Sequence, residues 1–394
     1  MKTFYTATLS VIAMFQANAA EPRVPVFRAV EIDKQVQIGY GVTVADVNGD
    51  KKPDIILADK NVIVWYQNPT WEKHIIAEKL TELDNVCVAA ADINGDGKAE
   101  IAVGAGWNPG DTIGSGAVFY MIPPSDRTQR WEPVKLPHEP TTHRMRWVRN
   151  ELGKYDLLVV PLHGRGNKNG EGEGVKVQTY RMPADPKESW TITTIDSAQH
   201  MTHNFNPLQW DADVANELLL ASKEGIYFLG RNGNSWTKKA IARSGEQGFA
   251  GAGEVRDGKL KSGSRFIAAI EPMHGNQFVI YSTDKPASDQ LWKRHMLDDS
   301  LNEGHAVACG DLGSGSDSVV VGWRGKKVGD KVGIKLFTAL DAAGSEWKQT
   351  PVDDGGMACE DLCLADLNGD GRLDIIASGR ATKNVKIYFN EGIK

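Results

Sequence analysis

The chain of 394 residues is poor in cysteine, nearly balanced in charge and free of long apolar runs. Its four cysteines are too few for a disulfide-stapled fold, and none are paired at the spacing of a zinc finger. A net charge of −6 argues against nucleic acid and anionic membranes as partners. No stretch approaches the roughly 18 apolar residues of a membrane span, so we expect no transmembrane segment.

The cysteines themselves are expected to be core residues. Cys87, Cys309 and Cys363 lie in apolar runs, where thiols usually pack as small hydrophobic side chains. Cys359 and Cys363 could pair, although so short a loop rarely closes a disulfide.

Residues 1–20 have the pattern of a secretory signal peptide. Lys2 precedes a mostly apolar stretch, and Ala17 and Ala19 satisfy the small-x-small rule for cleavage after Ala19, with Ala20 as the alternative. No cysteine stands at the cut, which argues against a lipoprotein. We therefore predict an exported protein, periplasmic or extracellular.

Three acidic segments share one spacing. Each lies between two short apolar runs, so each is predicted to be a turn that joins two strands. Carboxylate or amide side chains stand at positions 1, 3, 5 and 9, and glycine at position 4 lets the chain fold back. The three sets are Asp46, Asn48, Asp50 and Asp54; Asp92, Asn94, Asp96 and Glu100; and Asp366, Asn368, Asp370 and Asp374. A fourth copy, residues 311–317, is degenerate.

Oxygen ligands at these positions are those that Ca²⁺ prefers, so the three loops are predicted calcium sites. The alternative is a solvated acidic turn without metal. That alternative suits the first loop best, because Lys51 and Lys52 follow its acidic residues. In either case the loops are expected to be structural.

A second marker recurs independently. Six tryptophans, 46 to 60 residues apart, each open a short strand with an apolar residue five positions on: Trp71, Trp131, Trp190, Trp236, Trp292 and Trp347. This period is typical of a radial repeat. Three further strand pairs, which lack the acidic loop, lie near residues 155–162, 217–221 and 265–270. Together with the four acidic copies they make seven repeats.

These repeats predict an all-β fold, a seven-bladed β-propeller. Residues 27–33 have the tryptophan pattern with Phe27 in its place, so the N-terminal segment should supply the outer strand of the last blade and close the ring. A closed ring leaves only short, protected sheet edges. Residues 21–394 are expected to form one domain.

Histidines mark the face opposite the acidic loops. In a propeller, the first strand of a blade begins on the face where the second strand ends. His305 lies six residues before Asp311, as Tyr40 and Glu360 lie six residues before their own acidic loops. His143 and His203 hold similar entry positions in blades three and four.

Three imidazoles from three blades should therefore point towards the axis at similar height. Converging neutral imidazoles favour Zn²⁺ or a similar divalent metal. The predicted ligands are His143, His203 and His305. The alternative is that each is a hydrogen-bonded structural histidine.

Five segments resemble the propeller domain of aldos-2-ulose dehydratase. They are His-Arg-Met-Arg-Trp at 143–147, Pro-Leu-His-Gly-Arg-Gly at 161–166, Gly-Glu-Gly-Val at 172–175, His-Asn-Phe at 203–205 and Glu-Pro-Met-His-Gly at 271–275. The resemblance runs through blades three to six, whereas blades one, two and seven resemble generic FG-GAP or VCBS repeats. In that family the propeller carries a divalent metal and eliminates water from a keto sugar such as 1,5-anhydrofructose. Related bacterial propellers are implied to be lyases of 3-keto-glycosides.

The resemblance implies a secreted, metal-dependent carbon–oxygen lyase that performs β-elimination on a keto sugar. A metal would polarise the carbonyl, and histidine suits proton transfer because its pKa lies near working pH. We assign proton transfer to His163 and His274, with roles that could be exchanged with the predicted ligands. Arg165, Arg324 and Trp107 are the candidates to bind sugar hydroxyls, although packing is an equal alternative for Trp107.

A hypothesis of another class stays open: a non-catalytic, calcium-stabilised propeller that binds carbohydrate or protein. It needs no histidine cluster, so the cluster discriminates between the two. A quinone-type dehydrogenase is a weaker hypothesis, because we find no cofactor signature. Fold alone cannot choose, since propellers host many functions. The sequence does not indicate the oligomeric state.

Overall fold

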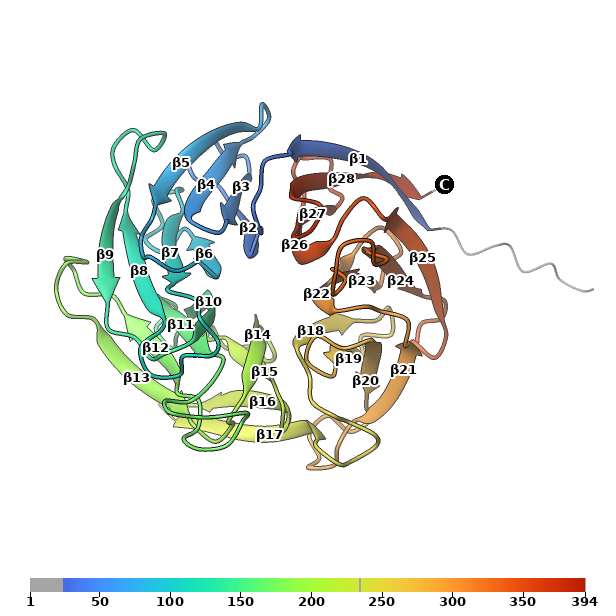
Figure 1. Ribbon diagram of the computed structural model, residues 1–394. Coiled ribbons are helices and arrows are strands. Elements are labelled where there is room, and N and C mark those ends of the chain that lie inside the picture. Colours follow the sequence, from blue (N-terminus) through green and yellow to red (C-terminus); the bar gives the residue numbers. More distant parts are fainter. Residues whose placement is uncertain (1–23, 234, 394) are drawn as a thin grey trace, which may run out of the picture.

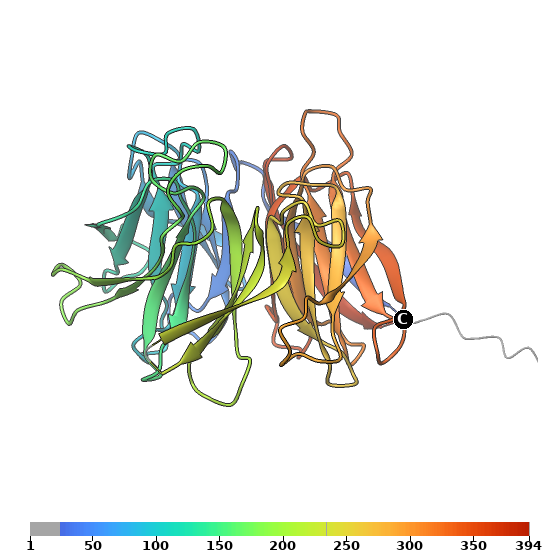
Figure 2. The same ribbon diagram turned by 90° about the horizontal axis from the view of Figure 1, so that it is seen from below.

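Seven antiparallel sheets of four strands each stand around a central axis in the computed structural model (Figure 1). The structure describes residues 24–233 and 235–393, so the predicted signal peptide at residues 1–20 lies outside the described residues. From the side, the strands run between the two faces of the ring (Figure 2). The predicted seven-bladed β-propeller is therefore confirmed.

Blades are numbered in chain order, with strands given from the axis outwards. Blades one to four are β2 (Gly41–Ala45), β3 (Asp54–Ala58), β4 (Val62–Gln67) and β5 (Glu72–Glu78); β6 (Cys87–Ala91), β7 (Glu100–Ala105), β8 (Ala117–Ile122) and β9 (Glu132–Leu136); β10 (Thr142–Arg149), β11 (Tyr155–Pro161), β12 (Val177–Arg181) and β13 (Thr191–Asp196); and β14 (Thr202–Leu208), β15 (Glu217–Ser222), β16 (Gly225–Asn232) and β17 (Ser235–Arg243). Blades five to seven are β18 (Glu254–Lys259), β19 (Arg265–Glu271), β20 (Gln277–Ser282) and β21 (Lys293–Asp298); β22 (Gly304–Asp311), β23 (Asp317–Trp323), β24 (Gly333–Ala339) and β25 (Trp347–Asp354); and β26 (Cys359–Ala365), β27 (Asp374–Gly379), β28 (Asn384–Ile393) and β1 (Pro25–Asp33).

The second strands form the centre of the core. β3, β7, β15 and β27 are buried at every residue. Each is a nearly continuous apolar run because its blade packs between two neighbours, and both faces lose contact with water. The core clusters accordingly span adjacent blades, as where Trp65 of β4 and Val103 of β7 share one cluster.

The outer strands tie the ring together. β1 pairs antiparallel with β28, with Ala29 opposite Tyr388, and Figure 1 shows the two strands side by side. This pairing confirms the predicted closure by residues 27–33. The tryptophan marker reflects packing between blades: the side chains of Trp131 and Trp292 belong to core clusters shared by adjacent blades, and the indole N–H of Trp131 donates to the carbonyl of Arg127 at 3.2 Å. Their backbone amides also bond to an outer strand of the preceding blade.

All four cysteines are free thiols, and Cys359 does not pair with Cys363. Burial raises the pKa of the Cys87 thiol to about 12. Among the described residues, no helix is long and apolar enough to cross a membrane.

Candidate functional site

Four histidines gather at one end of the central axis. His143, His203 and His305 each occupy the second position of an inner strand, in β10, β14 and β22, and each is at most 4% exposed. Equal positions in equivalent strands place the three side chains at similar height. His274 comes from the turn after β19 and has a left-handed φ of 53°. A non-glycine residue in this conformation carries strain, and such residues cluster at functional sites.

Three of these imidazoles converge. One ring nitrogen from each of His203, His274 and His305 lies within 4.8 Å of the others. The Nε2 atoms of His203 and His274 are 2.7 Å apart. The ring centroid of His305 lies 5.2 Å from that of His203 and 4.8 Å from that of His274. This donor set suits a metal held by three histidines with a position left open for a ligand.

Hydrogen bonds behind the rings fix their tautomers. Nδ1 of His305 donates to the backbone carbonyl of Glu360 at 2.5 Å. Nδ1 of His203 lies 3.1 Å from a backbone carbonyl and 3.2 Å from the carboxylate of Glu254, which is buried and accepts a hydrogen bond from Asn204. Because Nδ1 carries the proton, Nε2 of each ring keeps its lone pair for the interior of the cluster.

The surroundings keep these imidazoles neutral. Burial, reinforced by the positive charges of Arg144 and Arg324, holds the pKa of His203 and that of His305 well below the usual range. Burial and then the neighbouring His203 lower the pKa of His274 to about 2. Neutral imidazole is the form that binds a metal.

His143 lies beside the cluster but is not one of the converging rings. Its Nδ1 donates to the backbone carbonyl of His203 at 2.7 Å, and its Nε2 accepts a hydrogen bond from Arg144 at 3.0 Å. The structure therefore brings His274 to the place that the sequence analysis assigned to His143. Strand alignment alone could not show that Arg144 engages the second ring nitrogen. Trp107 stacks on His143, with ring centroids 4.8 Å apart.

A pocket of about 200 Å³ opens beside the cluster. The residues that line it include Tyr40, Trp107, His143, Arg144, His274, His305, Arg324, Glu360 and Arg380. The Glu360 carboxylate accepts hydrogen bonds from Arg324 at 2.8 Å and Arg380 at 3.0 Å. The hydroxyl of Tyr40 donates to Asp84 at 2.9 Å. Guanidinium donors and an aromatic face in one small pocket suit a polar ligand such as a sugar.

Two of the predicted residues do not line this pocket. His163, in the turn after β11, is partly buried, and its Nδ1 has no hydrogen-bond partner among the described residues. Arg165 is 44% exposed and pairs with Glu139 at 3.3 Å. Sequence spacing placed both on the correct face but could not show which side chains of that face line the pocket. Arg324 and Trp107, by contrast, line the pocket as predicted substrate-binding residues would.

Sequence reasoning gave no role to Tyr40, Glu254 or Glu360. The alignment that selected His305 also placed Tyr40 and Glu360 at inner-strand entries, so a positional signal was present. Glu254 is the first residue of β18 in blade five, and it follows Gly253, whose carbonyl faces His203. A lone glutamate or tyrosine has no residue-type signature that would link it to a histidine cluster.

The acidic loops lie at the other end of the blades and share one hydrogen-bond network. The first aspartate accepts backbone amides from residues three and five positions on, as Asp46 does from Gly49 and Lys51, both at 2.7 Å. Asp92 and Asp366 make the same two bonds. Glycine at position 4 has a left-handed φ between 73° and 84° in all three loops.

The ninth residue of each loop is buried. Asp54, Glu100 and Asp374 are at most 2% exposed. Burial, together with repulsion from the other acidic residues of the loop, raises the pKa of Asp54 to about 6 and that of Glu100 to about 7, although backbone amides oppose the shift. The carboxylates are thus grouped at a cost that a bound cation would offset.

One further loop of this kind, between β14 and β15, escaped the sequence analysis. Oxygen atoms of Asp211, Asp213 and Glu217 lie within 4.8 Å of one another. Glu217 accepts the amide of Trp210, seven residues earlier, as the ninth residue does in the other loops. The motif was missed because Gln209 replaces the leading aspartate.

Comparison with protein families agrees with this architecture. Residues 38–103 match the FG-GAP-like repeat and residues 88–121 the FG-GAP repeat. Residues 115–284 match the family described as aldos-2-ulose dehydratase, beta-propeller domain. The last match includes every strand from β8 to β20, whereas His305 lies beyond it. The expected resemblance is therefore confirmed to FG-GAP repeats in blades one and two and to the dehydratase propeller in blades three to five. The three matches end before blades six and seven, where the resemblance stays a prediction.

Solved structures share the fold at low identity. A chain of the mitotic checkpoint complex aligns with a TM-score of 0.58 and 12% identity, covering 98% of this chain and 99% of that one. The extracellular domain of a one component system from B. thetaiotaomicron aligns with a TM-score of 0.54 and 9% identity, covering 92% of this chain and 40% of that one. Hydrazine synthase of Kuenenia stuttgartiensis aligns with a TM-score of 0.53 and 10% identity, covering 91% of this chain and 97% of that one. Identities this low show the fold alone, and no curated protein matches the chain.

Proposed function

We propose that the protein is a metal-dependent carbon–oxygen lyase that performs β-elimination on a keto sugar, such as 1,5-anhydrofructose or a 3-keto-glycoside. The observation that carries the proposal is the convergence of His203, His274 and His305 beside a pocket of polar donors. The similarity of residues 115–284 to the dehydratase propeller supports the class of substrate.

The residues present fit a divalent transition metal such as Zn²⁺. His203 and His305 turn Nε2 inwards because their Nδ1 atoms face backbone carbonyls, and Glu254 supports His203 from behind. A metal held by the three histidines would supply Lewis-acid polarisation of the ketone.

Other residues of the pocket would bind and orient the sugar. Trp107, stacked on His143, offers an aromatic face to the ring of the sugar. Glu303 and Glu360 hold Arg324, and Glu360 holds Arg380. The N–H groups left over, most of them on Arg380, are positioned to bind hydroxyls and the negative charge that develops on the ketone oxygen.

Proton transfer falls to two other groups that line the pocket. We assign the Glu360 carboxylate to accept the proton from the carbon next to the ketone. The C=C bond then forms as the β carbon–oxygen bond breaks, and the Tyr40 hydroxyl protonates the leaving oxygen. Burial and the bond to Asp84 raise the pKa of Tyr40, so its hydroxyl keeps its proton until that step.

We further propose that the acidic loops at positions 46–54, 92–100 and 366–374 hold Ca²⁺ as a structural ion. Their grouped carboxylates support this role. Export to the periplasm or the extracellular space rests on the pattern of residues 1–20 and is proposed on that basis.

The test is elimination itself, followed by the ultraviolet absorbance of the enone product. Wild-type protein is incubated with 1,5-anhydrofructose and with 3-keto-glycosides. We expect turnover by the wild type, a fall of at least about a hundredfold in His305→Ala, and full retention in His74→Ala, a histidine of outer strand β5. Metal-loaded wild type without turnover would contradict the lyase and favour the non-catalytic propeller.

A further inference from the structure

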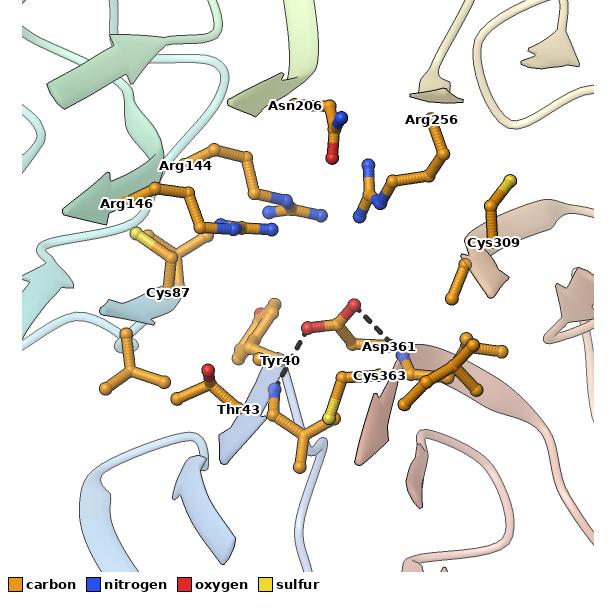
Figure 3. A pocket seen from close by; sticks show the side chains of 17 residues that line it. Tyr40, Thr43, Cys87, Arg144, Arg146, Asn206, Arg256, Cys309, Asp361 and Cys363 are labelled. Carbon is orange, nitrogen blue, oxygen red and sulfur yellow. Dashed lines mark hydrogen bonds between the residues drawn. The ribbon is translucent and has the colours of Figure 1, made fainter. Parts of the chain in front are cut away.

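A second cavity, of about 240 Å³, lies on the axis next to the histidine pocket. Its walls come from the inner strands: Arg144 and Arg146 of β10, Arg256 of β18 and Asp361 of β26. Figure 3 shows the three guanidinium groups directed into this axial cavity, with the Asp361 carboxylate on the opposite wall. Arg144 lines both cavities.

Positive charge in the axial cavity exceeds the negative charge that faces it. Asp361 accepts two backbone amides, at 2.9 and 3.0 Å, and forms no ion pair among the described residues. Arg256 approaches Glu254 at 3.7 Å. Within the same described part of the chain, Arg144 and Arg146 form no ion pair. Buried charge of one sign is unfavourable unless a counter-charge is supplied.

Most N–H donors of these guanidinium groups are uncommitted. Arg146 donates through Nη1 to the carbonyl of the preceding residue at 2.8 Å, and Arg256 does the same at 2.6 Å. Each guanidinium has five N–H donors, so several are left to face the cavity. Burial and then repulsion from Arg256 lower the pKa of Arg146, which is the expected effect of crowded cations.

We propose that the axial cavity binds a small oxyanion, of the size of inorganic phosphate or a free carboxylate. Guanidinium forks match two oxygens of such an anion. Three guanidinium groups surround this cavity of about 240 Å³, which has room for an ion of this size. Because Arg144 also bonds to His143, the anion would fix one wall of the neighbouring histidine pocket.

Calorimetric titration with inorganic phosphate at constant ionic strength tests this proposal. The parent protein is His305→Ala, so that phosphate bound at the histidine cluster does not contribute to the signal. We expect saturable binding that is about tenfold or more weaker in Arg146→Gln and unchanged in Arg130→Gln, a surface arginine. Asp361→Asn should bind phosphate more tightly, because it removes the opposing charge.

A competing titration with sodium acetate separates the two sources of oxyanion. Competition by acetate supports a site that also takes carboxylates, and phosphate binding without such competition supports a phosphate site. Absence of saturable binding to the folded parent overturns the proposal, as does equal weakening in Arg130→Gln. If Arg146→Gln does not fold, Arg256→Gln makes the same comparison, and the expected gain in Asp361→Asn is independent of both.

Discussion

The acidic loops and the histidine cluster are two groups of potential metal ligands at opposite ends of the same blades, and they satisfy their polar atoms in different ways. In the first loop, Asp46 and Asp54 each accept two backbone amides. In the cluster, Nε2 of His203 and Nε2 of His274 face each other at 2.7 Å. The loop carboxylates are already bonded to the chain, whereas His203 and His305 are bonded to the chain through Nδ1, on the side away from the cluster.

This difference is the one we expect if the acidic loops have a structural role and the histidine cluster a functional one. In a loop whose own amides already bond its carboxylates, we expect a bound ion to add stability. Rings whose Nδ1 atoms are anchored and whose Nε2 atoms converge are positioned for a ligand that reacts or exchanges. Four predictions test this contrast.

The largest effect should separate His274 from His143 within the histidine face. His274→Ala should weaken Zn²⁺ binding by at least about a hundredfold, because it removes a converging nitrogen. His143→Ala should change it by less than about tenfold, since both nitrogens of that ring bond to protein groups. Competition against a chelator of known affinity measures both. Equal losses in the two variants would show that His143 is a ligand.

The next effect concerns the residue behind His203. Glu254→Gln should weaken Zn²⁺ binding by about tenfold, because a neutral amide supports the ring less well than a carboxylate. Glu82→Gln, at an exposed position, is the matched control. Circular dichroism establishes that the variant is folded. Unchanged affinity would make Glu254 a packing residue only.

A smaller effect is expected from the aromatic wall of the pocket. Trp107→Ala should raise KM for the keto sugar by up to about tenfold and leave kcat within about threefold, because it removes a binding surface and no reacting group. Steady-state kinetics with the enone assay measures both constants. A collapse of kcat with unchanged KM would argue against a binding role.

The smallest effect belongs to the acidic loops. The folded-state pKa of Glu100, about 7, lies above its ordinary value of 4.5, so between these pH values the folded protein holds a proton that the unfolded chain has released. Stability in EDTA should therefore fall as pH rises from 4.5 to 7. Glu100→Gln should flatten this slope, which thermal unfolding measures. Glu82→Gln is the control and should keep the wild-type slope. If Glu100→Gln also keeps that slope, the pH dependence of stability does not come from Glu100.

The fold was predictable because its repeats carry their own markers. Acidic turns of fixed spacing and the tryptophans of the outer strands gave the blade count, and Phe27 identified the closing strand. These signals are local in sequence, and the structure confirms them. The loop at Asp211 escaped because one substitution at its first position hides the pattern.

The candidate site was predictable only in part. Entry positions placed His203 and His305 at one end of the axis, and the exit of β19 placed His274 on the same face. Which rings converge depends on side-chain direction and on neighbours, as Arg144 shows by engaging Nε2 of His143. His163 and His274 both follow the second strand of a blade, and spacing alone does not show that only His274 lines the pocket.

The central claim is that the histidine end of the axis holds a functional metal. Metal analysis after dialysis tests it most directly, with wild type compared against His203→Ala and against His295→Ala, a histidine of outer strand β21. We predict about one transition metal per chain in the wild type and in His295→Ala, and none in His203→Ala. Calcium alone in the wild type, or a transition metal that survives in His203→Ala, would contradict the account.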